Sequence, residues 1–358
     1  MEYAIGFIIL LGVLIFVHEF GHFIVAKIAG VKVLKFSLGF PPVAVKRKWG
    51  ETEYMLSWVP LGGYVKLLGE TPDSEEDISP EDSHRTLESK SLLSRFAIIA
   101  AGPLANFVLA AVLLSGGFLA GRPVLVSEVG KILEGSPAME AGMKAGDLVT
   151  AIEGQEIWRW DDMRRLIEKS PDEALSITVK RDGQDSILKV TPRVGDNKDF
   201  FGRPVGRVGI GPSGKSVQLG VFASIREGCR FTVYLTRLVF ETLIMLVKGD
   251  ISPKALGGPI QIVQASGESL KAGAISFMFL MSYISINLAI INLLPIPILD
   301  GGHLLFYLIE AITRRPVTGK VREVATQVGL LFIVFLMLMV FYNDISRIIT
   351  QGWSLKPQ

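Results

Sequence analysis

The sequence holds a single cysteine, Cys229, among its 358 residues. No internal disulfide can form, although this leaves open whether the protein works in an oxidising compartment. An excess of one charge is also missing, and the net charge of +2 gives no indication of nucleic-acid binding. Apolar residues are abundant instead, at 49% of the chain with a mean hydropathy of +0.42. This composition predicts several membrane spans together with at least one domain exposed to water.

The first apolar run, from Tyr3 to Val17, lacks the features of a cleaved signal peptide. No Lys or Arg precedes it, no small-residue cleavage site follows it, and the polar pair His18-Glu19 interrupts it before it resumes at 23–28. We therefore expect a retained membrane span. Three later runs have about the length needed to cross roughly 30 Å of hydrocarbon: Phe96 to Leu119, Ile275 to about Leu294, and Val328 to Tyr342.

The expected fold class is a multi-span α-helical membrane protein with a membrane-associated β-hairpin region and an inserted β-rich domain. Stretch 221–248 is apolar but carries three arginines, so we favour an amphipathic helix on the membrane surface over a fifth span. The expected segments are a first transmembrane helix (1–30), a β region with an acidic loop at 70–90 (31–93), a second helix (94–120), the β-rich domain (121–215), the amphipathic segment (216–272), a third helix (273–300), a loop (301–327), a fourth helix (328–346) and a tail (347–358).

Basic residues predict how these spans are oriented. None precedes the first span, whereas Lys and Arg cluster at its far end and just after it, and the loop 301–327 is basic too. By the positive-inside rule those two sides face the cytoplasm. The domain at 121–215 and both termini are then expected to face outward.

The stretch His18-Glu19-Phe20-Gly21-His22 is an H-E-x-x-H motif inside the first span. On a helix, residues four apart project from one face, so both histidines can bind one zinc ion while Glu19 takes a proton from water that the metal acidifies. The alternative is two helix-end histidines at the membrane interface. Metal binding is favoured because an unpaired ionisable residue at mid-span costs roughly 2.5–3.5 kcal/mol, and three occur within five positions.

A catalytic zinc site needs a third protein ligand and an open position. Asp300 is the best candidate, because Pro295 and Pro297 break the end of the third span just before it. Broken backbone at membrane depth is tolerated only within protein or beside a water-filled cavity, and the predicted topology puts Asp300 on the same side as the histidines. A helix N-cap is the alternative for Asp300. His303 is a rival ligand, for which we favour a supporting or interface role.

Asn287 and Asn292 lie in the third span, where amides often join neighbouring helices by hydrogen bonds. A substrate helix must be unwound before its peptide bonds can be cut, and side-chain amides can bind the backbone groups that unwinding frees. We favour this substrate-binding role for Asn292, which is closer to Asp300, and leave it open for Asn287. Edge strands of the 31–68 region could bind the same backbone by β-augmentation.

Three motifs, occurring in this order, resemble the site-2 protease family of intramembrane zinc metalloproteases, most closely its bacterial RseP type. They are the H-E-x-x-H motif, Gly102-Pro103-Leu104-Ala105-Asn106, and the stretch from Asn292 to Gly301. The resemblance covers nearly the whole chain and implies a place in the bacterial inner membrane. It also implies zinc bound by His18, His22 and Asp300, Glu19 as catalytic base, Asn292 holding unwound substrate, and Asn106 within a motif near the active site.

The segment 124–191 is similar to a bacterial PDZ domain. Its expected elements are strands at 124–129, 148–152, 176–181 and 187–191, a helix at 160–169, and turns at Glu153-Gly154 and Asp182-Gly183. A PDZ domain binds chain ends by strand addition, but it could equally exclude bulky substrates, and both readings stay open. The space fits one PDZ domain, whereas the RseP type often carries two in tandem.

The leading interpretation is an intramembrane protease that cuts single-span membrane proteins after another protease has removed their outer domain. By the resemblance, such substrates include anti-sigma factors and remnant signal peptides. A non-catalytic PDZ-containing scaffold is the alternative; its structural metal site would be closed by a fourth ligand, and only His303 is available. A broken third span also occurs in transporters, but no inverted repeat is visible.

Overall fold

The computed structural model describes residues 2–70, 78–198, 203–252 and 257–353. The chain forms two compact units: unit 1 comprises 1–117 and 225–358, and unit 2 comprises 118–224. Part of the predicted acidic loop, at 71–77, and the last five residues of the predicted tail lie outside the described residues. The described part of that loop contains a short 3-10 helix, η1 (Pro80–Arg85).

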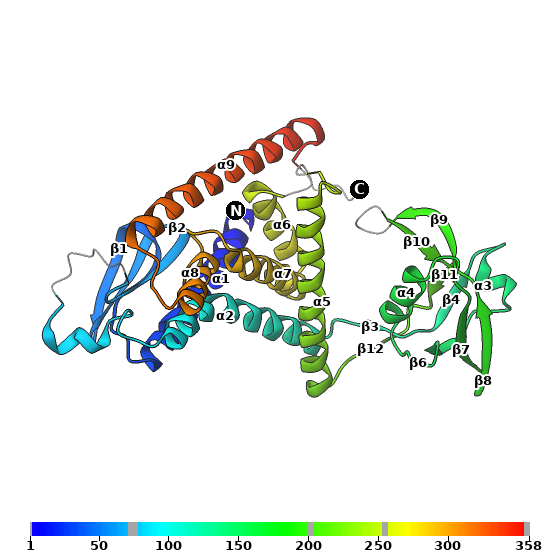
Figure 1. The fold of residues 1–358 in the computed structure, drawn as a ribbon. Helices are drawn as coiled ribbons and strands as arrows, with labels where there is room; N and C mark the ends of the chain where they lie inside the picture. Colours follow the sequence, from blue (N-terminus) through cyan, green and yellow to red (C-terminus); the bar gives the residue numbers. More distant parts are fainter. Residues whose placement is uncertain (1, 71–77, 199–202, 253–256, 354–358) are drawn as a thin grey trace. The chain divides into compact units, whose positions relative to one another are not determined.

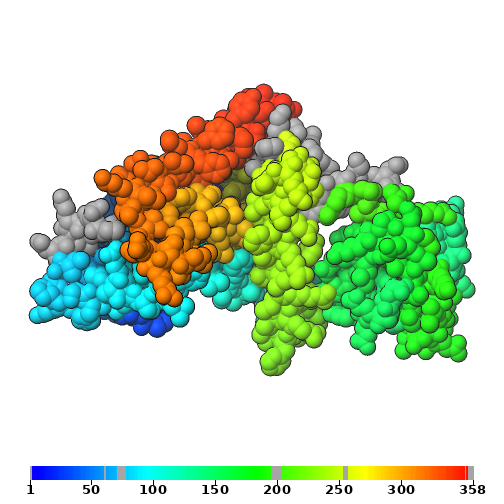
Figure 2. All heavy atoms as spheres, in the orientation of Figure 1, coloured from blue at the N-terminus to red at the C-terminus, as the bar shows by residue number. Residues whose placement is uncertain are grey.

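Unit 1 is mainly helical (Figure 1). Four helices, α1, α2, α7 and α9, are long and apolar enough to cross a membrane, which confirms the four predicted spans. The side chains of α9 lie largely at the surface (Figure 2), and only 6% of its most apolar window is buried, as suits a helix surrounded by lipid. The helices of this unit are α1 (Glu2–Ile28), α2 (Leu92–Leu119), α5 (Val221–Lys248), α6 (Pro259–Lys271), α7 (Ala274–Leu293), α8 (Asp300–Thr313) and α9 (Gly319–Gln351).

The structure differs from the prediction between residues 293 and 319. The stretch 301–327 is not mainly a loop, since most of its first half forms α8. Asp300 opens α8 rather than ending the third span, because Pro295 and Pro297 stop α7 at Leu293 and separate the two helices. Leu299 is the residue at the N-cap of α8, so Asp300 does not take the capping position considered as an alternative.

The segment 216–272 contains two helices, α5 and α6, and α6 packs closely against α1. A Cβ atom at Gly6 of α1 would lie 2.9 Å from the carbonyl oxygen of Ser266 in α6. Ser266 is fully buried, and so is the neighbouring polar residue Gln264, which is 1% exposed. The polar face of α6 therefore faces protein within unit 1.

The predicted β-hairpin region consists of β1 (Val33–Trp49) and β2 (Thr52–Leu67), which pair antiparallel. Phe36 pairs with both Val65 and Tyr54, so the first half of β1 lies between the two halves of β2. Within the described residues, the stretch 63–67 pairs with β1 on one side only. It is an edge strand.

Unit 2 is built around a four-stranded sheet in the order β6-β5-β7-β8. Its core gathers apolar side chains from this sheet and from the amphipathic helix α4 (Trp160–Lys169), including Met163 and Ile177, both 0% exposed. The predicted helix and the two predicted turns are confirmed, and the predicted strand 124–129 is divided into β3 and β4. The remaining elements of unit 2 are β3 (Val124–Leu125), β4 (Val129–Ile132), α3 (Pro137–Glu140), β5 (Leu148–Ile152), β6 (Gln155–Glu156), β7 (Leu175–Arg181), β8 (Gln184–Val190), β9 (Arg193–Lys198), β10 (Pro204–Arg207), β11 (Ile210–Pro212) and β12 (Ser216–Val217).

Candidate metal centre and active site

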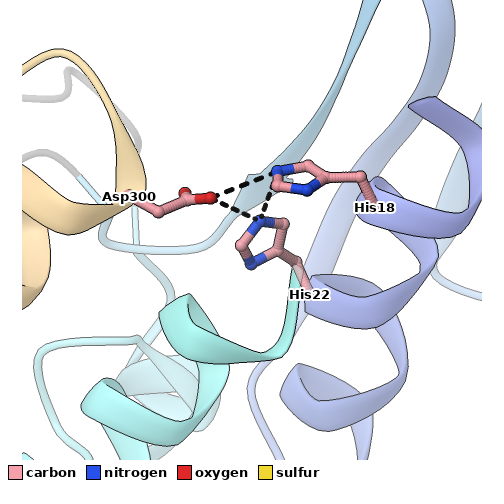
Figure 3. A group of neighbouring side chains, drawn as sticks. All are labelled: His18, His22 and Asp300. Atoms are coloured by element: carbon pink, nitrogen blue, oxygen red, sulfur yellow. Dashed lines mark hydrogen bonds and ion pairs between the residues drawn. The ribbon is translucent and has the colours of Figure 1, made fainter. Parts of the chain in front are cut away.

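The side chains of His18, His22 and Asp300 converge where α1 meets the first residue of α8 (Figure 3). The two Nε2 atoms are 3.3 Å apart. Oδ2 of Asp300 lies 3.2 Å from Nε2 of His18 and 3.5 Å from Nε2 of His22. Both histidines are buried, each 8% exposed. In the described part of the chain, this is the one group of three or more His, Cys, Asp or Glu residues placed to hold a metal ion.

The donor set and its spacing fit a tetrahedral zinc ion. Ligand atoms that are about 2.0–2.2 Å from such an ion lie roughly 3.3–3.6 Å from one another, and the three distances here are 3.2, 3.3 and 3.5 Å. Oδ2 of Asp300 is buried without a hydrogen-bond partner in the described residues. A cation shared with the two imidazole nitrogens would satisfy this buried carboxylate oxygen, and two histidines with one carboxylate leave a fourth zinc position open.

Helix α2 holds the ring of His22 in place. Nδ1 of His22 lies 2.9 Å from the main-chain carbonyl oxygen of Ile98, so a proton on Nδ1 is donated to that oxygen and the lone pair of Nε2 is free for a metal. The helices can approach because Gly102 has no side chain: a Cβ there would overlap the ring of His22. Gly21 likewise lies against the backbone of Ala101. Small residues at a helix crossing permit this close contact.

Two asparagines contact His18. Nδ2 of Asn106, a fully buried residue of α2, is 3.3 Å from Nδ1 of His18. Nδ2 of Asn292, near the end of α7, is 3.3 Å from Nε2 of His18. Asn287 is not brought into the cluster, and its amide donates to the main-chain oxygen of Tyr283 at 2.8 Å within α7.

Glu19 lies between the cluster and the edge strand of the β region. It follows His18 directly in α1, and a Cβ at Gly63 would lie 3.0 Å from its Cγ atom. Gly63 begins the edge stretch 63–67 of β2. The carboxylate is therefore next to both the ligand histidine and an extended backbone.

An ion pair fixes the helix that carries Asp300. Glu310 of α8 accepts two hydrogen bonds from Arg95 at the start of α2, at 2.5 and 3.2 Å, and both side chains are 14% exposed. The guanidinium of Arg95 also lies over the ring of Tyr307, 5.1 Å from its centroid. These contacts anchor α8 to α2, which also supports the histidines.

His303, the rival ligand, lies outside the metal-ligand group; its ring makes an edge contact with Phe306 at 6.4 Å. Three contributions to the site were not predicted from the sequence: the carbonyl of Ile98, the room provided by Gly102, and the Arg95–Glu310 pair. Gly102 and Asn106 lie in a motif that the resemblance already marked as close to the active site. Nothing in the sequence pattern indicated a role for Ile98, Arg95 or Glu310.

Two histidines and a glutamate on α1, a helix that can cross a membrane, lie with an aspartate at the start of α8. This arrangement defines a metal-dependent hydrolase of the membrane. The family model described as peptidase family M50 matches residues 6–336. The chain therefore belongs to peptidase family M50, the site-2 proteases, and it is a zinc-dependent metalloendopeptidase.

Relatives match along nearly the whole chain. A protein of Agrobacterium fabrum named as a zinc metalloprotease is 35% identical over 97% of this chain and 96% of its own length. The regulator of sigma-W protease RasP of Bacillus subtilis is 30% identical, and the regulator of sigma-E protease RseP of Salmonella typhimurium is 31% identical. Each of these two alignments covers 96% of this chain and 98% of the relative.

Proposed function

We propose that this protease hydrolyses peptide bonds in the transmembrane segments of single-span membrane proteins, with zinc held by His18, His22 and Asp300. The observation that carries the proposal is the spacing of the three ligand atoms, which matches the edges of a tetrahedral zinc site. Two of these atoms are on α1, a helix of membrane-spanning length, and the third is on the first residue of α8. Zinc, when bound, supplies Lewis-acid chemistry that polarises a peptide carbonyl and makes water more acidic. The side chains around the zinc position supply proton transfer and substrate binding.

Glu19 is proposed as the general base. Its position directly after His18 puts its carboxylate within reach of a water molecule at the open side of the ligand cluster, from which it can take a proton and pass it to the leaving amine. Glu19 is half-buried on α1 against Gly63 of β2, which limits the access of bulk water to that transfer. His22 and His18 keep their orientation through their contacts with α2.

Substrate backbone is proposed to bind between Asn292 and the edge stretch 63–67. Asn292 places an amide 3.3 Å from His18, where it can bond a carbonyl or N–H freed by unwinding the substrate helix. Among the described residues the stretch 63–67 pairs with β1 on one side only. An extended substrate can be added to its other side, next to Glu19, in place of the Glu70 carboxylate that accepts a 3.2 Å hydrogen bond from the N–H of Leu67. Asn287 is a weaker candidate, since its amide already has a partner in its own helix.

The proposed location is the bacterial cytoplasmic membrane, with the cluster near the cytoplasmic side and unit 2 outside. The support is the distribution of Lys and Arg, which are concentrated after α1 and around the start of α9. The relatives named as sigma-factor regulators suggest anti-sigma factors, trimmed beforehand by another protease, as substrates, and remnant signal peptides share the same single-span form.

Unit 2 is proposed to be a single PDZ domain that screens substrates. A groove of about 360 Å³ lies between α4 and the β10–β11 segment, lined by Trp160, Met163 and Ile167 on the helix side and by Val208 and Ile210 on the other. In the described residues β11 pairs only with β4, so an extended chain end could add to its other edge. Exclusion of bulky outer domains remains the second way in which this unit could act.

The test is to incubate the purified full-length protein with a tagged single-span substrate beside the variant Glu19→Gln. The variant is expected to keep its zinc and to lose cleavage by at least about 100-fold, in keeping with the size of general-base contributions. Equal cleavage by a folded, zinc-loaded Glu19→Gln protein would remove Glu19 from the mechanism. A soluble peptide with the same cleavage sequence serves to separate loss of chemistry from loss of membrane-substrate binding.

A further inference from the structure

The side chain of Asn106 is completely buried beside His18, and one of its polar atoms has no partner among the described residues. Its Nδ2 atom lies 3.3 Å from Nδ1 of His18, whereas Oδ1 makes no hydrogen bond with any described residue. The backbone of Asn106 is fixed as well, because its carbonyl oxygen accepts a 2.8 Å hydrogen bond from the hydroxyl of Ser285 in α7. A buried amide held at this position can determine which ring nitrogen of His18 carries a proton.

The surroundings of His18 determine which of its ring nitrogens faces the ligand cluster. Nε2 lies 3.2 Å from Oδ2 of Asp300 and 3.3 Å from Nε2 of His22, while Nδ1 points to Asn106. A neutral imidazole that binds a metal through the lone pair of Nε2 carries its proton on Nδ1. The group that faces Asn106 is then an N–H donor.

An N–H donor requires an acceptor, and the amide of Asn106 provides one if its oxygen and nitrogen exchange places by a half-turn. That rotation puts Oδ1 at the position 3.3 Å from Nδ1 of His18. Either orientation leaves one amide atom without a described partner, so the number of hydrogen bonds does not decide between them. The ligand role of Nε2 does decide, because an amide NH₂ facing an N–H would place two donors against each other.

We propose that Asn106 is a positioning residue for the metal site: its Oδ1 accepts the Nδ1 proton of His18 and so directs the lone pair of Nε2 into the cluster. Ile98 already acts in this way on His22, through a carbonyl oxygen 2.9 Å from Nδ1. Helix α2 then orients both histidines of α1, one with a main-chain and one with a side-chain oxygen. The proposal rests on the proposed role of His18 as a zinc ligand.

The experiment measures zinc affinity of the full-length protein in detergent, by metal content after equilibration with a graded zinc–chelator buffer. Asn106→Leu removes the amide at similar volume and is expected to weaken zinc binding about 10- to 100-fold, the usual effect of losing a hydrogen-bond partner of a ligand histidine. Asn106→Asp keeps an acceptor and has no donor, so it should bind zinc within about threefold of the wild type. Ser282→Ala is the matched control: Ser282 is equally buried, on α7, and within the described residues its hydroxyl donates only to the main-chain oxygen of Met278 in its own helix.

Two outcomes overturn the proposal: Asn106→Leu binding zinc as tightly as the wild type, or folded Asn106→Asp losing zinc as fully as Asn106→Leu, since the amide would then act as a donor. Helical content by circular dichroism shows whether each variant folds. Should Asn106→Leu fail to fold, Asn106→Asp decides alone. His18→Ala distinguishes this failure from failure of the proposed function, because unchanged zinc binding by His18→Ala contradicts the ligand assignment itself.

Discussion

Replacing Gly102 by alanine changes the site by a single methyl group, and the structure gives the size of the effect. The added Cβ would lie 2.6 Å from Cε1 and 2.8 Å from Cδ2 of His22, and it would also overlap Nε2. Because non-bonded carbon atoms normally lie about 3.5–4.0 Å apart, relieving the contact with Cε1 alone requires the imidazole to move by at least about 0.9 Å. Zinc ligands keep their distances to within about 0.2 Å, so a shift of this size is incompatible with the site.

The expected result for Gly102→Ala is a loss of kcat/KM of about 100-fold or more, equivalent to roughly 2.7 kcal/mol, together with weaker zinc retention. The assay is cleavage of a tagged single-span substrate, with zinc content measured on the same sample. Gly12→Ala in α1 is the matched control, because nothing lies within 4 Å of a Cβ at that position. That variant should keep full activity. Wild-type zinc content and cleavage in Gly102→Ala would refute the close crossing of α1 and α2 at His22.

Three further variants test parts of the structure outside the ligand cluster. Glu310→Gln leaves Arg95 buried without its counter-charge, which should lower the free energy of opening α8 by about 3 kcal/mol. The measurement is hydrogen exchange across 300–313, which should become faster; unchanged exchange would show that the pair does not anchor α8. Asp344→Asn replaces the carboxylate that accepts hydrogen bonds from the first backbone N–H groups of α6. The free energy of opening α6 should fall by about 1 kcal/mol, measured as faster hydrogen exchange at 259–271; equal exchange rates would count against this cap. In unit 2, burial opposes ionisation of Asp147, but hydrogen bonds from Arg181 outweigh it and lower the pKa of Asp147 below its ordinary value. The pair therefore stabilises the folded unit at neutral pH, and this contribution is lost as the pH falls below about 4. The protection factors at 144–152, which correct for the intrinsic pH dependence of exchange, should fall in acid in the wild type and not in Asp147→Asn; an equal fall in both would contradict the assignment.

The helical spacing of His18 and His22 was enough to predict that they share a face of one helix, and the structure places them so. Asp300 could be selected because topology and the Pro-x-Pro break brought it to the same membrane side. Its setting in the first turn of α8 was missed, because the third span was expected to reach residue 300 and a loop to follow it. Consecutive glycines have low helix propensity, but tertiary packing overrides it here: Gly301 and Gly302 are buried, and a Cβ on either would overlap neighbouring backbone.

Other features of the site depend on contacts that no local pattern records. The carbonyl of Ile98 acts through the main chain, so the identity of the residue carries no signal. The pairing of Phe36 with both Val65 and Tyr54 depends on the register of two long strands, which alternation alone does not determine. In unit 2, by contrast, strand alternation and two tight turns are local signals, and β5, α4 and the turns were placed correctly.

We propose that Asp300 completes a zinc site with His18 and His22 while His303 stays outside it. The zinc content of purified Asp300→Asn and His303→Ala proteins, equilibrated side by side against the same chelator buffer, tests this directly. We expect Asp300→Asn to lose its zinc and His303→Ala to retain one zinc ion per chain, as the wild type does. Zinc retained at wild-type affinity in Asp300→Asn, or lost in a folded His303→Ala protein, would contradict it.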